Sequence, residues 1–249
     1  MSDEATWDVV VVGAGAGGAA AAYGLCRRGL SVLLLDAGPQ FDPATDYPLT
    51  EADWDVREFP QKPGSVGRVT LAPGQRLSGN EPLLTSGSRG LGPMVTNGIR
   101  LMDKYEHVRG IGGSTLHFTG EAHRLHPAAM KMKSRFGIAA DWPIDYAELE
   151  SYYCEAEELI GVAGPDSDGV RWRSRKYPLP PHPLSYAAKT LGKGARALGL
   201  GWQANSRAAL SQEWNARPPC NYCGACNNGC PRADNGSADV TFIHAAAST

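Results

Sequence analysis

The sequence predicts an α/β fold that opens with a Rossmann-like βαβ unit. Residues 7–12 contain the β-branched run Val9–Val12, which is typical of a strand buried on both faces of a parallel sheet. An Ala-rich stretch from Gly17 to Arg28 follows and stops at Gly29, a residue favoured just after a helix. The apolar run Ser31–Leu35 predicts a second buried strand. Strand, helix and strand in this order define the unit.

Composition excludes several classes of protein. The chain has 249 residues, of which 42% are apolar and 20% charged, which is typical of a globular protein and not of a disordered chain or a coiled coil. Its 24 basic and 26 acidic residues give a net charge of −2, and no basic stripe indicates binding to nucleic acid. The short basic run 171–176 is expected to be a solvated loop.

One long uncharged stretch, residues 9–26, needs a separate explanation. Asp3, Glu4 and Asp8 precede it, where a signal peptide carries basic residues, and its five glycines make it a poor membrane span. We expect no transmembrane segment and a cytoplasmic location, although export to the periplasm together with a partner subunit stays open.

Beyond the βαβ unit the predicted elements are separated by irregular chain. Residues 39–105 are rich in Gly and Pro and predict a long irregular insertion with a short strand-like run at Arg68–Leu71. One helix is expected from His126-Pro127 to Gly137 and another from Tyr186 to Leu198. The last fifty residues are expected to be loops.

A further helix is predicted between Asp145 and Gly161. Asp145 and Glu148 have the spacing of a capping box, and Gly161 marks the end. The positions expected to face the core are Tyr146, Leu149, Tyr153, Ala156 and Ile160.

The glycines of the first turn match the dinucleotide-binding pattern G-x-G-x-x-G. Gly13 would make the tight turn, Gly15 would let the backbone approach a pyrophosphate, and Gly18 would allow close packing of helix on strand. Asp36, at the end of the second strand, would accept hydrogen bonds from ribose hydroxyls. No arginine follows it, which argues against NADP, but the motif alone does not separate FAD from NAD.

Four cysteines form a cluster with the spacing C-x2-C-x2-C-x3-C-P. Cys220, Cys223, Cys226 and Cys230 have the arrangement of a bacterial ferredoxin run, which predicts an iron–sulfur cluster. Zinc fits less well, because structural zinc sites usually pair two short hooks across a longer loop. A loop that holds disulfides or reduced thiols is the third interpretation. Cys26 and Cys154 are expected to be inert core residues.

Four segments resemble one family, the glucose–methanol–choline (GMC) flavoprotein oxidoreductases. They occur in the order of the family and span most of the chain. The segments are Leu33-Leu-Leu-Asp36-Ala-Gly38, Arg109-Gly-Ile-Gly112-Gly113-Ser114-Thr115-Leu-His117, Asp141-Trp-Pro-Ile-Asp145 with the following Tyr-rich stretch, and Arg217-Pro-Pro-Cys220 with Gly236-Ser237 and Thr241-Phe242. The last of them resembles the gluconate-dehydrogenase-like branch.

The resemblance implies FAD as the cofactor and assigns residues to it. On its own, the small-residue turn Gly112, Gly113, Ser114 and Thr115 is either an anion-binding nest or a sharp bend. The family implies that this turn wraps the flavin and its phosphates. His117 stands where some family members carry a histidine bonded covalently to the flavin methyl group, whereas a lone histidine between apolar residues is also common in a protein core.

The resemblance further implies that the chain is the N-terminal half of a GMC fold. We expect an FAD-binding domain over residues 1–160 and a Cys-containing segment over residues 161–249. The catalytic His and its His/Asn partner lie beyond residue 249 in the family, so no catalytic residue is assigned and this chain alone is expected to be inactive.

The implied reaction is oxidation of a CH–OH group by hydride transfer to flavin N5. The substrate would be an alcohol, a sugar or a sugar acid, and a dehydrogenase is favoured over an oxidase. The expected partners are a complementing C-terminal piece, a small subunit or a cytochrome. The alternative is a non-catalytic electron-transfer or complementing subunit that carries an iron–sulfur cluster.

Overall fold

The computed structural model describes residues 6–47, 95–96, 99–100, 108, 110–166, 169, 171–224, 226 and 229–249. The strand-like run Arg68–Leu71, Arg109 and most of the insertion 39–105 therefore lie outside the described residues. The chain forms two compact units. Unit 1 comprises Met1–Thr119, Tyr222–Ala233 and Ser237–Thr249, and unit 2 comprises Gly120–Asn221 and Asp234–Gly236. The predicted boundary at residue 160 separates an FAD-binding domain from a Cys-containing segment. The two compact units do not test that boundary, and it stays a prediction.

Unit 1 contains the predicted βαβ unit. Strand β1 (Val9–Val12) is followed by helix α1 (Ala16–Cys26) and strand β2 (Val32–Leu35). The two strands are parallel, with Val9 opposite Val32 and Val12 opposite Leu35. The element order is confirmed, and each end lies within a few residues of its predicted position.

The two faces of this small sheet differ, and the prediction of strands buried on both faces is wrong. The Val11 face lies against α1, since a Cβ added at Gly18 would lie 3.4 Å from Val11 Cγ1. On the opposite face Val10 is 53%, Val12 82% and Leu35 46% exposed. Among the described residues, the apolar run meets a helix on the Val11 side only.

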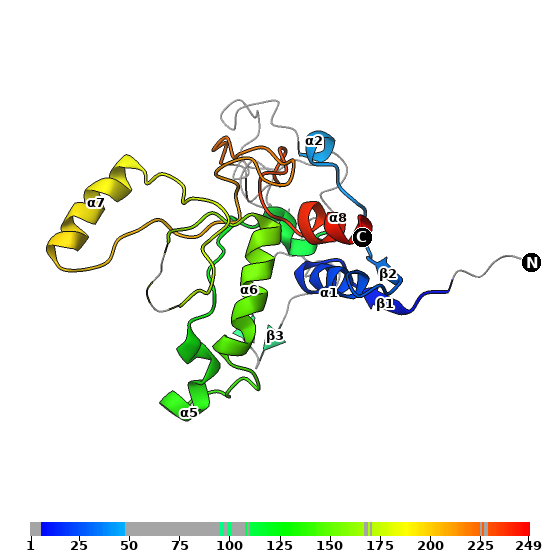
Figure 1. Ribbon diagram of the computed structural model, residues 1–249, viewed down its shortest axis with the longest axis horizontal. Coiled ribbons are helices and arrows are strands. Elements are labelled where there is room, and N and C mark those ends of the chain that lie inside the picture. The colour runs from blue at the N-terminus through cyan, green and yellow to red at the C-terminus, as the bar shows by residue number, and fades with distance from the viewer. Residues whose placement is uncertain are drawn as a thin grey trace, which may run out of the picture. The chain divides into compact units, whose positions relative to one another are not determined.

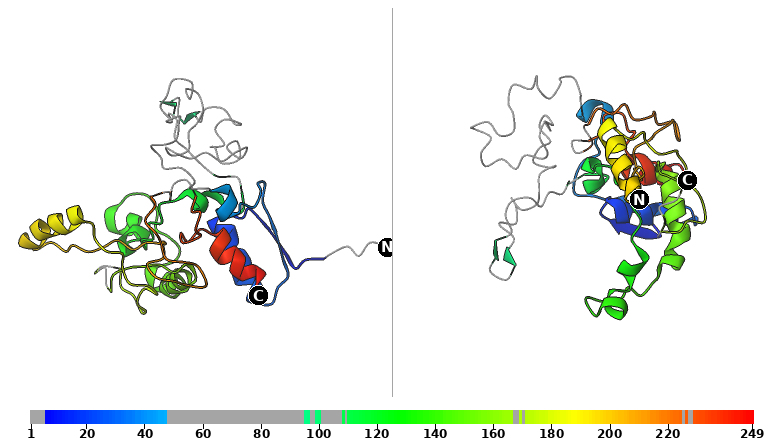
Figure 2. Two further views of the ribbon diagram at one scale, coloured as in Figure 1. Left: turned by 90° about the horizontal axis from the view of Figure 1, so that it is seen from above. Right: turned by 90° about the vertical axis from the view of Figure 1, so that its left-hand side faces the viewer.

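The C-terminus of unit 1 is helical, whereas the sequence predicted loops. A π-helical turn, η4 (Asp239–Ile243), continues into α8 (His244–Ala247). This segment lies beside α1, as Figures 1 and 2 show, and the Tyr23 and Phe242 rings meet edge to face at 6.0 Å. The short Ala-rich segment gains its helical form from this tertiary contact, which local sequence does not reveal.

The described part of unit 1 also contains a short α-helix, a short strand pair and a 3₁₀ helix. Helix α2 (Pro43–Asp46) follows the βαβ unit, strands β3 (Val95–Thr96) and β4 (Ile99–Arg100) form a short antiparallel pair, and η1 (Gly113–His117) is a 3₁₀ helix. A small apolar core gathers Phe41, Tyr47, Val108 and Leu116.

The helices of unit 2 largely match the prediction. They are η2 (Pro127–Met130), α5 (Met132–Phe136), α6 (Tyr146–Ile160) and α7 (Tyr186–Ala197). The single helix expected from His126 to Gly137 is divided at Lys131, where φ is −128° and ψ is 43°. The capping box of Asp145 and Glu148 is present, and Gly161 ends α6 with φ +81°.

The core of unit 2 lies where irregular segments meet. Ala163, Leu179 and Leu210 are buried together, and Trp214 packs against them. Helix α7 extends away from this core in Figures 1 and 2, and its Leu191 and Leu198 are exposed. Among the described residues, no helix is long and apolar enough to cross a membrane.

Candidate functional site

The Gly-rich turn between β1 and α1 has the geometry that a dinucleotide requires. Gly13 has φ +97°, and its N–H donates to the Leu35 carbonyl at 2.7 Å. A Cβ added at Gly18 would lie 1.8 Å from the Gly13 carbonyl oxygen, so only glycine allows this close packing. A Cβ at Gly15 meets nothing within 4 Å among the described residues, so the space on that side of the Gly15 backbone is open.

Helix α1 directs its N-terminus at this open space. No side chain caps its first turn, with Gly15 as the N-cap residue. Backbone N–H groups at the start of a helix carry partial positive charge and bind phosphates well. The combination of open space and uncapped N–H groups fits a diphosphate.

Asp36 is held at the end of β2 by two backbone hydrogen bonds. Its Oδ2 accepts from the Ala14 N–H at 2.8 Å, and its Oδ1 accepts from the Gly38 N–H at 2.9 Å. Each carboxylate oxygen can accept a second hydrogen bond. Asp36 thus stabilises the Gly-rich turn and keeps the capacity to accept ribose hydroxyls.

The second predicted motif packs directly on the first. The Gly112 N–H donates to the Ala14 carbonyl at 2.9 Å, and a Cβ added at Gly113 would lie 2.9 Å from Gly15 Cα. Both residues have positive φ values, +104° and +55°. Two segments that are distant in the sequence form one glycine-lined backbone surface, as the flavoprotein resemblance implies.

The hydroxyl groups of Ser114 and Thr115 hold this second turn in place. Thr115 Oγ1 donates to the Gly112 carbonyl at 2.6 Å and accepts from the Ala238 N–H at 2.8 Å. Ser114 Oγ accepts from the Val108 N–H at 3.3 Å. Their direct contact with a cofactor stays a prediction.

His117 ends the 3₁₀ helix η1, and its Nε2 atom is buried. Within the described part of the chain, this nitrogen has no hydrogen-bond partner. Burial lowers the pKa of His117, so the imidazole is neutral at pH 7. A buried ring nitrogen without a partner, on the short helix that begins at Gly113, fits a bound cofactor, which would supply the missing contact.

The four clustered cysteines gain no support as a metal site. Cys223 is exposed, and the other three are half-buried. Among the residues that the structure describes, no three Cys, His, Asp or Glu side chains converge on a point where a metal ion could bind. The same finding gives no support to zinc. Cys154 is buried as predicted, whereas Cys26 is only half-buried.

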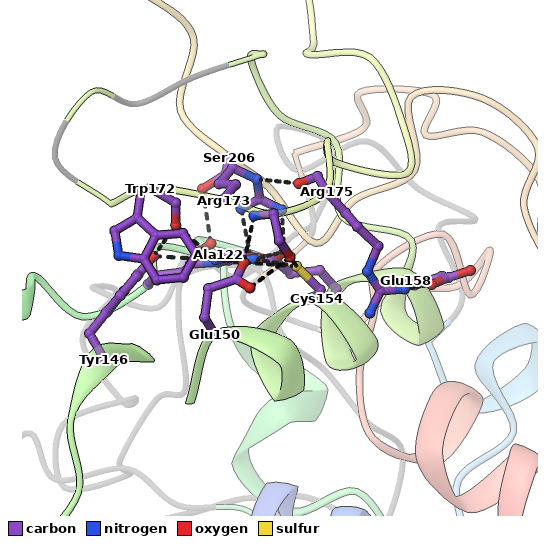
Figure 3. Close-up of polar contacts among 12 residues, drawn as sticks. Ala122, Tyr146, Glu150, Cys154, Glu158, Trp172, Arg173, Arg175 and Ser206 are labelled. Carbon is purple, nitrogen blue, oxygen red and sulfur yellow. Dashed lines mark hydrogen bonds and ion pairs between the residues drawn. The ribbon is translucent and has the colours of Figure 1, made fainter. Parts of the chain in front are cut away.

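A buried network of charged groups in unit 2 was not predicted (Figure 3). Arg124, only 2% exposed, donates through Nε and Nη2 to the Glu157 carboxylate, both at 2.8 Å, and through Nη1 to Glu150 Oε1 at 2.9 Å. Arg173 also binds Glu157. Two arginines therefore face two carboxylates.

Polar neighbours complete this network. Tyr146 Oη and Cys154 Sγ accept from Arg124 at 3.2 and 3.1 Å, and Ser174 donates twice to Glu150. Burial by itself raises the pKa of Glu150, but the hydrogen bonds from Ser174 and Arg124 lower it to about 2. The carboxylate therefore stays ionised at every physiological pH.

The network corrects two predictions. The basic run 171–176 is not simply a solvated loop, since Arg173 is an ion-pair partner buried inside unit 2. Cys154 lies in a polar environment and not in an apolar core. The signal in the sequence was Glu150 and Glu157, seven residues apart on the face of α6 that also carries Tyr146 and Cys154.

Comparison with known proteins agrees with this geometry. A family model described as FAD dependent oxidoreductase matches residues 8–47. The large subunit of fructose dehydrogenase from Gluconobacter japonicus is 31% identical over 92% of this chain and 41% of its own length. The gluconate 2-dehydrogenase flavoprotein of Pantoea cypripedii is 26% identical over 96% of this chain and 42% of its own length.

An oxidase is similar over the same region. The 6'''-hydroxyparomomycin C oxidase of Streptomyces lividus is 28% identical over 95% of this chain and 38% of its own length. The chain thus spans about two fifths of the length of the curated relatives it matches.

Proposed function

This chain belongs to the GMC family of FAD-dependent oxidoreductases, and from that premise we propose that it forms the FAD-binding portion of an enzyme that oxidises CH–OH groups. The observation that carries the proposal is the packing of Gly112 and Gly113 against Ala14 and Gly15. It joins the dinucleotide turn to the turn that resembles the flavin-binding segment of the family.

The residues of the site would divide the binding of FAD between them. The α1 N-terminus and the open backbone at Gly15 would bind the diphosphate, and Asp36 would accept hydrogen bonds from ribose hydroxyls. His117, neutral at pH 7, would contact the flavin through its buried Nε2 atom. When bound, FAD supplies the acceptor for the hydride that leaves the substrate carbon.

We also propose the class of substrate and partner. Relatives named for fructose, gluconate and a propanediol support an alcohol, a sugar or a sugar acid as substrate. Both dehydrogenases and oxidases are among the relatives, and we propose a dehydrogenase because of the resemblance to the gluconate-dehydrogenase-like branch. The name of the Gluconobacter relative, a large subunit, supports a complex with a further subunit, and we propose that this subunit accepts the electrons.

Titration with FAD tests the cofactor proposal. Gly15→Ala places a methyl group in open space, so we expect the unloaded protein to keep its melting temperature. The methyl group would meet the diphosphate, however, and we expect FAD to bind at least about tenfold more weakly. Flavin fluorescence during the titration gives the dissociation constant.

Gly194→Ala is the matched control for this titration. Gly194 lies in α7, and a Cβ there also meets nothing within 4 Å. Its affinity for FAD should equal that of the unchanged protein. Equal affinities for the Gly15→Ala and Gly194→Ala variants would contradict the placement of the diphosphate, and failure of the unchanged chain to bind FAD would refute the proposed function.

His117 has a test of its own. We expect His117→Ala to weaken FAD binding, because the variant loses the contact of a buried nitrogen with the cofactor. Acid precipitation of the loaded protein then decides between the two forms of that contact. Yellow colour in the pellet indicates a covalent bond, and colour in the supernatant indicates a non-covalent one. An unchanged affinity in the variant would exclude both.

A further inference from the structure

Tyr47 carries a buried polar atom that the site described above does not use. The side chain follows α2 and is only 5% exposed. Within the described residues, its phenolic oxygen has no hydrogen-bond partner. Folded proteins rarely leave a buried hydroxyl group in this state, so a partner outside the described residues is expected, and a bound cofactor is one such partner.

The ring of Tyr47 is fixed in position. It packs against Phe41, with ring centroids 6.0 Å apart, and it lies in the apolar core with Leu116. A Cβ added at Gly229, which has φ +92°, would lie 2.4 Å from the Tyr47 ring, so the backbone closes over it. The hydroxyl group cannot turn toward solvent without breaking these contacts.

The surroundings of Tyr47 belong to the predicted cofactor-binding segments. Leu116 immediately precedes His117 in the sequence, and Phe41 comes shortly after Asp36 and Gly38. Asp239 is close enough to Tyr47 to interact with it electrostatically, and its Cβ lies 3.3 Å from the position of a Cβ at Gly112. One cluster of unit 1 thus joins Tyr47 to the Gly112 turn.

The charges near the hydroxyl group indicate what it can bind. Burial raises the pKa of Tyr47 well above its usual value, and the carboxylates of Asp239 and Asp46 raise it further. The phenol therefore keeps its proton and is available as a donor. A diphosphate would be repelled by the two carboxylates, whereas an uncharged oxygen would not.

We propose that Tyr47 is an FAD-binding residue, whose O–H donates a hydrogen bond to an uncharged oxygen of the ribityl–isoalloxazine half of the cofactor. The proposal rests on the proposed function, because it requires FAD in unit 1. It assigns to Tyr47 a role that neither glycine turn supplies, since those turns offer backbone N–H groups to the charged diphosphate.

Tyr47→Phe tests this assignment by two opposite effects. Without FAD, the variant loses a buried hydroxyl group that lacks a partner, so we expect its melting temperature to rise by about 2–5 °C. With FAD, it loses one hydrogen bond, so we expect the affinity to fall about three- to tenfold. Titration with ADP, which lacks the flavin half, should give the same affinity in both proteins.

Tyr152→Phe is the control, because Tyr152 is an exposed tyrosine on α6. It should change neither the melting temperature nor the affinity. An unchanged FAD affinity in Tyr47→Phe would overturn the proposal, as would a lower melting temperature without FAD or an equal loss of affinity for FAD and ADP. If the unchanged chain itself failed to bind FAD, the proposed function would fall, and this inference with it.

Discussion

The glycines of the first turn look alike in the sequence, but the structure leaves a different amount of space around each of them. A Cβ at Gly18 would collide with the Gly13 carbonyl oxygen, a backbone atom that cannot move aside cheaply. A Cβ at Gly17, one residue earlier in α1, meets nothing within 4 Å. The two neighbouring positions should respond to alanine in opposite directions.

We expect Gly18→Ala to lower the free energy of unfolding by about 1–3 kcal/mol, because helix and strand must separate to admit the methyl group. Gly17→Ala should raise it by about 0.5–1 kcal/mol, because alanine loses less backbone entropy in a helix. Urea denaturation without FAD measures both values. Similar losses in the two variants would show that the helix does not pack as closely as the structure indicates.

Residues whose role is local were predictable. The capping box at Asp145 and Glu148 and the positive φ of Gly161 follow from short-range spacing, and the structure confirms them. Arg124 was not predictable, because its partners Glu150 and Glu157 lie 26 and 33 residues away and only the fold brings them together. The burial of Tyr47 was not predictable for the same reason, because Val108 and Leu116, which pack in its core, are distant in the sequence.

At the scale of elements, α6 buries a charged face. Glu157 accepts hydrogen bonds from both Arg124 and Arg173, so its carboxylate balances two guanidinium groups together with Glu150. We expect Glu157→Gln to lower the free energy of unfolding by about 3–5 kcal/mol, because it leaves a buried positive charge without compensation. Denaturation by urea gives this value.

Glu158→Gln is the matched control on the same helix. Glu158 pairs with Arg175 at 2.9 Å, and both side chains are exposed. Glu158→Gln should lower the free energy of unfolding by less than about 1 kcal/mol, as is usual for exposed ion pairs. Equal effects at positions 157 and 158 would mean that the network does not stabilise unit 2.

The low pKa of Glu150 makes the network sensitive to acid. An unfolded Glu titrates near about 4.3, whereas the folded pKa is about 2. A depressed pKa contributes stability that is complete above the unfolded value and is lost as pH falls toward the folded value. We expect a loss on the order of 2–3 kcal/mol between about pH 5 and pH 2 that is missing in Glu150→Gln. Unfolding curves recorded at several pH values give the pH dependence of the free energy of unfolding for both proteins. Equal pH dependence in the two proteins would contradict the low pKa of Glu150.

Whole elements were predictable where one segment specifies them. The βαβ order and helices α6 and α7 follow from periodicity, caps and glycines. The C-terminal helix α8 was not predicted, because its packing against α1 stabilises it. The exposed face of β1 was not predicted either, because an apolar run in the sequence does not show whether one or both faces of the strand are covered. The glycine turns were found in sequence, but their mutual packing required the structure.

At the scale of the molecule, the exposed face of the β1–β2 sheet has consequences for solubility. Val10, Val12 and Leu35 lie side by side on it, since the parallel register places Val12 opposite Leu35 and Val10 opposite Leu33. In the part of the chain that the structure describes, both strands are also edges of a two-stranded sheet. Contiguous apolar side chains beside open strand edges favour association with another surface.

We therefore expect the isolated chain to self-associate, and Val12→Thr combined with Leu35→Thr to reduce that association. Threonine is β-branched, a shape that strands favour, and both positions point away from α1, so the melting temperature should change little. Sedimentation velocity at several protein concentrations measures the change. Leu30→Thr is the control, because Leu30 is an exposed leucine of unit 1 that lies between α1 and β2 and outside both strands. If the double variant associated as strongly as the control, another surface of the chain would be responsible.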